Sequence, residues 1–106
     1  MKQSLLVVGL TAAALVAGTA SAGEHEVAQK DKRFTVEKLE IKSGDVVSFP
    51  NQDSVFHNVF SLSPAKTFDL GSYPKGETKK VTFDKPGSVE VECAIHPTMK
   101  MTIDVK

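Results

Sequence analysis

The chain has 106 residues, which is enough for one domain, and its 13 basic residues are balanced by 13 acidic ones. This balance argues against nucleic acid as a partner, because phosphate binding rewards a basic surface. Cys93 is the only cysteine, so the domain contains no internal disulfide of the kind on which small exported domains often rely.

The first 22 residues predict a secretory signal peptide followed by a single domain over residues 23–106. Lys2 supplies a basic start, residues 5–17 form an uncharged apolar run, and Ala20-Ser21-Ala22 fits a small-residue cleavage site. The apolar run is short for a membrane span, and a retained anchor is the alternative. Cleavage after Ala22 would export the domain to the periplasm with 12 basic and 13 acidic residues, because Lys2 is the only charged residue removed.

The rest of the chain shows short strand patterns and no helical periodicity. Apolar and polar residues alternate at 34–36 and, one residue out of phase, at 39–41, which indicates a bulge or bend. A turn at 43–45 precedes a strand in which Val47 and Phe49 share one face.

A short strand over residues 57–60 is followed by the longest irregular stretch, 61–76, which contains two prolines and two glycines. Further strands are expected around 81–83, 88–93 and 99–105. Short strands with turns at this spacing predict an antiparallel sandwich or barrel. The predicted core includes Phe49, Phe60, Phe83, Val89, Val91, Ile103 and Val105.

The last two predicted strands place chemically distinctive side chains at one end of the fold. The inward face of strand 88–93 ends on Cys93, the following loop carries His96, and Met99 opens the returning strand. His57 comes from a different strand upstream. Two imidazoles and one thiolate, with a weak thioether above their plane, are the ligands of the trigonal sites of blue-copper electron carriers.

Other chemistries match these residues less well. A structural zinc site usually has four cysteine or histidine ligands, and an iron–sulfur cluster needs about four cysteines. A cysteine nucleophile paired with a histidine is an alternative, but it leaves the methionine without a role and no oxyanion site is apparent. A lone thiol in an oxidising compartment is a liability unless it is occupied, and a bound metal would occupy it.

The chain resembles the cupredoxins over residues 34–106. The matching segments are Gly44-Asp45-Val46-Val47, Asn51, Asp53, His57-Asn58-Val59, Phe83-Asp84-Lys85-Pro86-Gly87 and the loop from Cys93 to Met99. The loop, with its order of Cys, two residues, His, Pro, one residue and Met, is most like that of amicyanins. The resemblance implies a Greek-key antiparallel β-sandwich that binds one type-1 copper ion, blue or green.

The resemblance also implies a role for each ligand. His57 would be the shielded imidazole ligand, Cys93 the thiolate, His96 the ligand whose ring edge reaches the surface, and Met99 the axial thioether. The backbone N–H of Asn58 is expected to point at the Cys93 sulfur and tune its redox potential.

Met101 competes for the axial position, because it shares a face with Met99 and other cupredoxins use its spacing. In the family the axial methionine is followed at +4 and +6 by buried aliphatic residues. From Met99 these are Ile103 and Val105, so Met99 is the predicted ligand.

The resemblance implies a monomeric one-electron carrier that docks on periplasmic redox proteins through the surface around His96 and Pro97. An amine-oxidising dehydrogenase is one candidate donor. An enzyme is not expected, because four protein ligands leave copper no open position for a substrate.

The alternative is a periplasmic copper-tolerance protein that sequesters copper or oxidises Cu(I). A mature chain beginning Gly23-Glu24-His25 would offer a free amine, two backbone amides and an imidazole, which together can bind Cu(II) in a square plane. The second methionine, Met101, favours the same interpretation.

Overall fold

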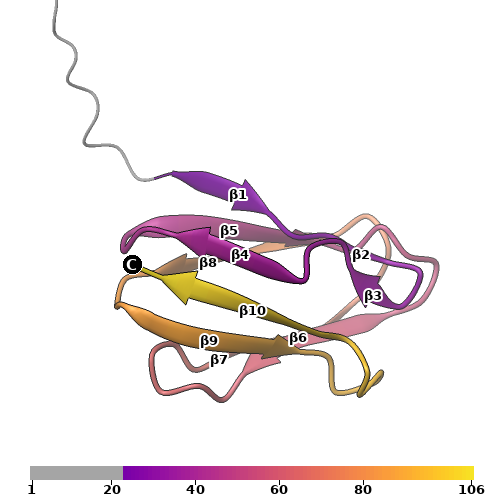
Figure 1. The fold of residues 1–106 in the computed structure, drawn as a ribbon. Helices are drawn as coiled ribbons and strands as arrows, with labels where there is room; N and C mark the ends of the chain where they lie inside the picture. The colour runs from indigo at the N-terminus through magenta and orange to yellow at the C-terminus, as the bar shows by residue number, and fades with distance from the viewer. Residues whose placement is uncertain (1–22) are drawn as a thin grey trace, which may run out of the picture.

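The computed structural model describes residues 23–106, so the predicted signal peptide at 1–22 lies outside the described residues. The described strands form two packed sheets and a short hairpin (Figure 1). One sheet has the order β1-β5-β8, with β1 at Glu24–Glu26, β5 at Asp45–Pro50 and β8 at Thr78–Phe83. The other has the order β4-β10-β9-β6-β7, with β4 at Lys38–Ile41, β6 at His57–Ser61, β7 at Phe68–Tyr73, β9 at Gly87–Glu92 and β10 at Lys100–Val105. The hairpin joins β2 (Gln29–Lys30) to β3 (Arg33–Phe34).

The predicted all-β sandwich is confirmed, and the pairing adds detail to it. Most neighbouring strands run antiparallel, including β5 with β8 and β9 with β10. Two pairs at the N-terminal side are parallel, β1 with β5 and β4 with β10. The break at Thr35–Glu37 between β3 and β4 is the bend that the phase slip predicted.

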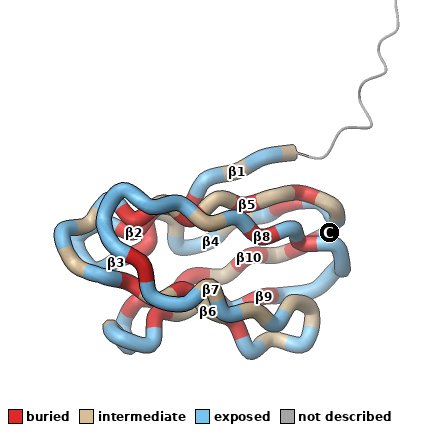
Figure 2. Tube along the Cα trace, turned by 180° about the vertical axis from the view of Figure 1, so that it is seen from behind, coloured by how far each residue is buried: buried red, intermediate tan, exposed pale blue. Residues whose placement is uncertain are grey.

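The core lies between the sheets, and along β5 and β6 buried residues alternate with less buried ones (Figure 2 colours the chain by burial). Val47, Phe49, Phe83, Val89, Val91 and Ile103 are all fully buried. The prediction for Phe60 was wrong, because β6 buries His57, Val59 and Ser61 and therefore turns Phe60 to the opposite, half-buried face. This phase of β6 directs His57 inward.

The predicted irregular stretch at 61–76 contains the strand β7, which corrects the sequence reading. Phe68 and Leu70 flank the polar Asp69, but Gly71 has a φ of +74° and Tyr73 rather than Ser72 is buried, so the alternation does not continue through the segment. Backbone pairing with β6 forms the strand all the same, with a register shift between Asn58 and Phe60.

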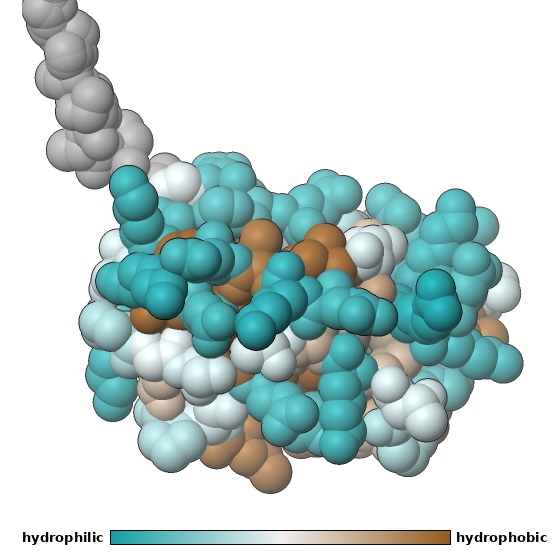
Figure 3. Space-filling model, viewed as in Figure 1, coloured by the Kyte–Doolittle hydropathy of each residue, from teal (hydrophilic) through white to brown (hydrophobic). Residues whose placement is uncertain are grey.

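The outer surface is mainly polar. The face shown in Figure 3 is dominated by hydrophilic residues, with apolar side chains visible as separate areas between them. Among residues 23–106 we find no helix with the length and apolar character needed to cross a membrane.

The two ends of the sandwich carry different groups. The β9–β10 loop lies at the right end in Figure 1, and the start of β1 and the C-terminus lie at the left end. The left end is closed by the turn before β5, where Gly44 has a φ of +99°, a conformation that favours glycine.

Candidate metal centre

Four predicted ligands come from three neighbouring elements at the right end of the sandwich. His57 is the first residue of β6, Cys93 directly follows β9, and Met99 directly precedes β10. His96 lies in the loop between β9 and β10. Two backbone hydrogen bonds shape this loop, because the Met99 N–H donates to the His96 carbonyl at 2.9 Å and the Cys93 N–H donates to the Met99 carbonyl at 3.2 Å.

The structure brings three of the four side chains together as potential metal ligands. The ligating atoms of His57, Cys93 and His96 all lie within 4.8 Å of one another. The Cys93 Sγ is 3.8 Å from the His57 Nδ1 and 3.9 Å from the His96 Nδ1. The two imidazole rings lie nearly edge to face, with their centroids 4.9 Å apart.

These separations fit a trigonal metal site. Zinc sites give a guide to bond lengths, at about 2.3 Å to sulfur and about 2.0 to 2.1 Å to nitrogen. Ligands about 120° apart at those lengths place sulfur and nitrogen about 3.8 Å from each other. Both observed sulfur–nitrogen distances agree with that value. A soft thiolate with two imidazoles is the donor set expected for copper.

Burial differs among the four residues in a way that matters for electron transfer. His57 is fully buried, and Cys93 and Met99 are almost completely buried. His96 is only half-buried, and its loop neighbours Ile95 and Pro97 are exposed. The histidine predicted to be shielded is therefore inside, and the one predicted to reach the surface does so.

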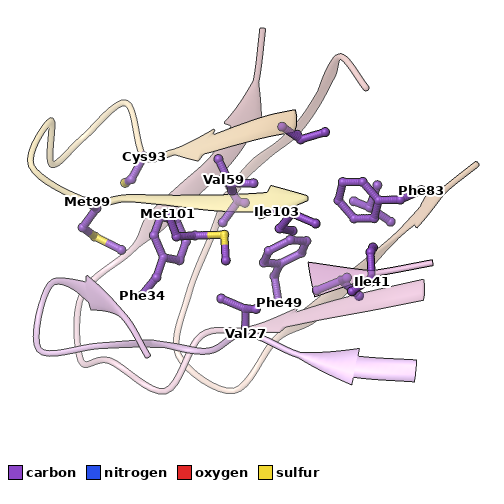
Figure 4. Close-up of a cluster of buried hydrophobic side chains, with 14 of the residues drawn as sticks. Val27, Phe34, Ile41, Phe49, Val59, Phe83, Cys93, Met99, Met101 and Ile103 are labelled. Carbon is purple, nitrogen blue, oxygen red and sulfur yellow. The ribbon is translucent and has the colours of Figure 1, made fainter. Parts of the chain in front are cut away.

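The two methionines lie at different positions along the buried cluster. In Figure 4, Met99 lies at the Cys93 end of the buried cluster, and Met101 lies farther along β10 toward Ile103. Met101 pairs in register with Val91 inside the sheet. Ile103 and Val105, the residues at +4 and +6 from Met99, are both buried as the spacing argument expects. These positions favour Met99 as the axial residue.

His57 has a second partner on the side away from the thiol. Its Nε2 lies 2.9 Å from the Asp53 Oδ2, so the carboxylate accepts from this nitrogen and leaves Nδ1 facing Cys93. The His57 hydrogen bond, followed by one from the Lys32 N–H, lowers the pKa of Asp53 to about 2. An ionised carboxylate behind a ligating imidazole fixes its tautomer and increases its basicity. From the sequence, Asp53 was named only among the residues that resemble the family, and its contact with His57 was not predicted. The signal for that contact was its position four residues before His57.

Hydrogen bonds from two parts of the chain hold the loop that carries Asp53. The buried Asn51 side chain donates to the carbonyls of Val55 and Tyr73, each at 2.9 Å, and accepts from the Asp53 N–H at 2.8 Å. The Lys32 N–H from the β2–β3 hairpin donates to the Asp53 Oδ2 at 2.8 Å. The carboxylate therefore has little freedom to move away from His57.

Asn58 lies where the resemblance placed it. Its backbone N–H points at the Cys93 Sγ with a nitrogen–sulfur distance of 3.5 Å. Its side chain donates to the Asp69 Oδ1 at 2.9 Å, which anchors it to β7. A hydrogen bond from the Gly71 N–H, followed by the one from Asn58, lowers the pKa of Asp69. The N–H donor stabilises negative charge on the sulfur.

His25, the candidate for a second copper site, lies far from this cluster, at the opposite end of the fold. It belongs to β1, which pairs with β5, and its Nε2 lies 2.9 Å from the Asp45 Oδ2. In this arrangement the imidazole and the backbone of residues 24–26 already have partners within the fold.

Comparison with known proteins agrees with the geometry. A family model of copper-binding proteins, the plastocyanin/azurin family, matches residues 21–106. The methylamine utilization protein MauL of Methylorubrum extorquens is 33% identical over 87 residues, covering 81% of this chain and 76% of the relative. Amicyanin-alpha of the same organism is 32% identical over 103 residues, covering 89% of this chain and 87% of the relative. Among solved structures, a purple cupredoxin from Nitrosopumilus maritimus has the same fold, with a TM-score of 0.70, 22% identity, and coverage of 77% of this chain and 99% of that one.

Proposed function

The chain belongs to the plastocyanin/azurin family of copper-binding proteins, and from that premise we propose that it is a periplasmic one-electron carrier. In this proposal the copper is held by His57, Cys93, His96 and Met99, and the domain at 23–106 is exported by the signal peptide at 1–22. The observation that carries it is the convergence of one thiol and two imidazole nitrogens within 4.8 Å.

The fold suits this function because it limits rearrangement around the ligands. Bound copper supplies a reversible one-electron couple, and a trigonal site of this kind serves electron transfer. The chain contributes rigidity: the fully buried His57 is fixed by Asp53, and the Cys93 sulfur is faced by the Asn58 N–H. Ligands held in this way keep nearly the same positions in both oxidation states.

Electrons would enter and leave through the ring edge of His96. This residue is half-buried. The apolar side chains of Ile95, its neighbour in the loop, and of Phe56, which directly precedes His57, are 48% and 55% exposed. An apolar surface allows a partner to dock without a large desolvation cost for charges. The association of the relative MauL with methylamine utilization supports an amine-oxidising dehydrogenase as a candidate donor.

Copper tolerance, by sequestering copper or oxidising Cu(I), stays an alternative prediction, favoured by Met101 and by a candidate second copper site at Gly23-Glu24-His25. In the structure the Gly23 N–H and His25 Nε2 both bind Asp45, at 2.8 and 2.9 Å. Square-planar coordination would require β1 to leave β5 and both groups to leave Asp45. Because of this competition we place electron transfer first.

A titration of the purified exported protein with Cu(II), followed by visible and EPR spectroscopy, tests the proposal. We expect an intense thiolate-to-copper band that saturates at one equivalent, and fast electron exchange of the loaded protein with a redox partner. A second, square-planar EPR species at two equivalents would favour copper handling. No intense band would mean that Cys93 does not bind copper, and the proposal would fall.

A further inference from the structure

Asp45 is a nearly buried carboxylate at the end of the sandwich opposite the metal centre. It is 7% exposed and receives three hydrogen-bonding groups. Its Oδ1 accepts from the Gly23 N–H at 2.8 Å, and its Oδ2 lies 3.0 Å from the Lys42 N–H and 2.9 Å from the His25 Nε2. These contacts join the start of β1 to the turn that precedes β5.

The approach of Gly23 to this carboxylate leaves little room for a side chain. A Cβ built on Gly23 would lie 3.1 Å from the Asp45 Oδ2 and 3.3 Å from the Oδ1 and Cγ. Contacts this short would push the carboxylate or the backbone out of place. Position 23 is therefore shaped for close contact between its backbone nitrogen and Asp45.

Signal cleavage would change the chemistry of that same nitrogen. Hydrolysis after Ala22 breaks the bond between the Ala22 carbonyl carbon and the Gly23 nitrogen, and water supplies the oxygen of the new carboxylate and the hydrogen of the new amine. The nitrogen then changes from a neutral amide donor into an α-ammonium, which is protonated near neutral pH.

We propose that Asp45 is the receptor for the mature N-terminus, so that export processing completes this end of the fold by placing the Gly23 ammonium against the Asp45 carboxylate. The inference rests on the cleavage site given in the proposed function. A neutral hydrogen bond becomes a charge-assisted one, which is shorter and about twice as strong. The expected effect is tighter docking of the edge strand β1 on β5.

The charge of the Asp45 carboxylate favours a cation at this position. Hydrogen bonds from His25, Lys42 and Gly23 lower the pKa of Asp45 to about 2, so the carboxylate is ionised at neutral pH. The shallow pocket around Gly23 is also lined by Glu24 and Glu40, which are acidic, and by Lys42 and Lys106, which are basic. Lys106 lies 4.0 Å from Glu40. The carboxylate that contacts the Gly23 nitrogen is that of Asp45.

A double-mutant cycle on the copper-loaded exported protein tests the inference. The full chain is expressed with its signal peptide, purified from the periplasm, and its first residue is identified by mass spectrometry. A second version carries one extra alanine between Ala22 and Gly23, and the product that begins with this alanine is isolated. Both versions are also made with Asp45→Asn, and with Asp84→Asn as a matched control, since Asp84 is 71% exposed.

We expect the natural product to begin at Gly23. In urea unfolding at neutral pH, the extra alanine should reduce the folding equilibrium constant by about threefold to tenfold. The reduction should disappear in the Asp45→Asn background and persist in the Asp84→Asn background, because only the first removes the partner of the amine.

Two results would overturn the inference. An extension that costs the same with and without Asp45→Asn shows that the amine does not bind this carboxylate. A natural product that begins elsewhere than Gly23 removes the ammonium from the site. In either case an intact thiolate-to-copper band leaves the proposed copper function standing, whereas loss of that band from the natural product would refute the copper function alone.

Discussion

Two aspartate–histidine pairs lie at opposite ends of the sandwich and have the same contact distance. Asp53 and His57 are 2.9 Å apart beside the metal centre, and Asp45 and His25 are 2.9 Å apart at the N-terminal end. The histidine is the largest cause of the lowered pKa of each carboxyl group, which is about 2 in both. The pairs differ in burial: the His57 side chain is fully buried, and that of His25 is 28% exposed.

The pairs also differ in the groups that surround them. The Nδ1 of His57 faces the Cys93 thiol at 3.8 Å, with His96 next to it. Both carboxylates also accept backbone hydrogen bonds, Asp53 from Lys32 and Asp45 from Gly23 and Lys42, but those to Asp45 hold the start of β1. The same hydrogen bond therefore supports a proposed ligand at one end and holds an edge strand at the other. Its function depends on the groups around the pair.

Replacing the two histidines gives the largest expected contrast. His57→Ala removes a buried residue that we propose as a ligand, so we expect the thiolate-to-copper band to be lost and copper affinity to fall by more than about 100-fold, beyond the usual effect of changing a group that hydrogen-bonds to a ligand. His25→Ala should leave the band intact. Visible spectroscopy and competition with a copper chelator measure both. An unchanged band in His57→Ala would refute the ligand assignment.

Replacing the two aspartates should have a smaller effect and separates their roles. Asp53→Asn leaves a neutral acceptor behind His57, so copper affinity should fall by about 10- to 100-fold and the reduction potential should rise, because the imidazole becomes a weaker donor. Asp45→Asn makes the same charge change and should alter only stability. Voltammetry measures the reduction potential and chelator competition the copper affinity. Equal changes in both quantities for the two variants would contradict this assignment.

The methionines provide the next comparison, within the metal end itself. Met99→Leu and Met101→Leu both conserve volume in a buried site and should each cost less than about 1.5 kcal/mol of stability. Only Met99→Leu should change the EPR spectrum and raise the reduction potential, because only Met99 is the proposed thioether ligand. A spectral change confined to Met101→Leu would reverse the axial assignment.

Sequence patterns were sufficient to predict the metal end. Strand alternation placed Cys93 on an inward face, and the structure has it there. The loop spacing and the resemblance then located His57 and His96, because these features depend on local sequence and on a motif of fixed order. The prediction that Asn58 faces the sulfur also agrees with the structure.

The N-terminal end could not be predicted in the same way, because its contacts join residues distant in sequence. Asp45 appeared only as a turn residue and as part of a matching segment, and its hydrogen bonds to Gly23 and His25 cross 22 and 20 positions of the chain. The strand β7 was missed for a related reason, since its formation depends on pairing with β6. Contacts of this kind leave no periodic signal in either segment.

Acid should weaken the N-terminal pair through a predictable range of pH. The pKa of Asp45 is lowered from 3.8 to about 2 by folding, so its contribution to stability is present above about pH 4 and is lost as the pH falls toward 2. In copper-free protein we expect Asp45→Asn to flatten this part of the stability profile, with a residual slope from Asp53 and Asp69, whose pKa values are also lowered. Urea unfolding midpoints of the original protein and of Asp45→Asn, measured from pH 5 to pH 2, test this expectation. Parallel profiles for the two proteins would contradict it.

The smallest expected effect concerns the hairpin that supports Asp53. Asp31 and Lys32 form its two-residue turn with φ values of +54° and +58°, a conformation that glycine adopts without steric cost. Lys32→Gly keeps the backbone N–H that donates to Asp53, so the copper spectrum should be unchanged while stability rises by about 0.5 to 1 kcal/mol. Lys85→Gly is the control, because Lys85 is exposed and has no positive φ, and it should give no gain. A spectral shift in Lys32→Gly would mean that the turn positions Asp53 through more than the Lys32 N–H. The groups that set the copper spectrum would then include the β2–β3 hairpin as well as the Asp53–His57 pair.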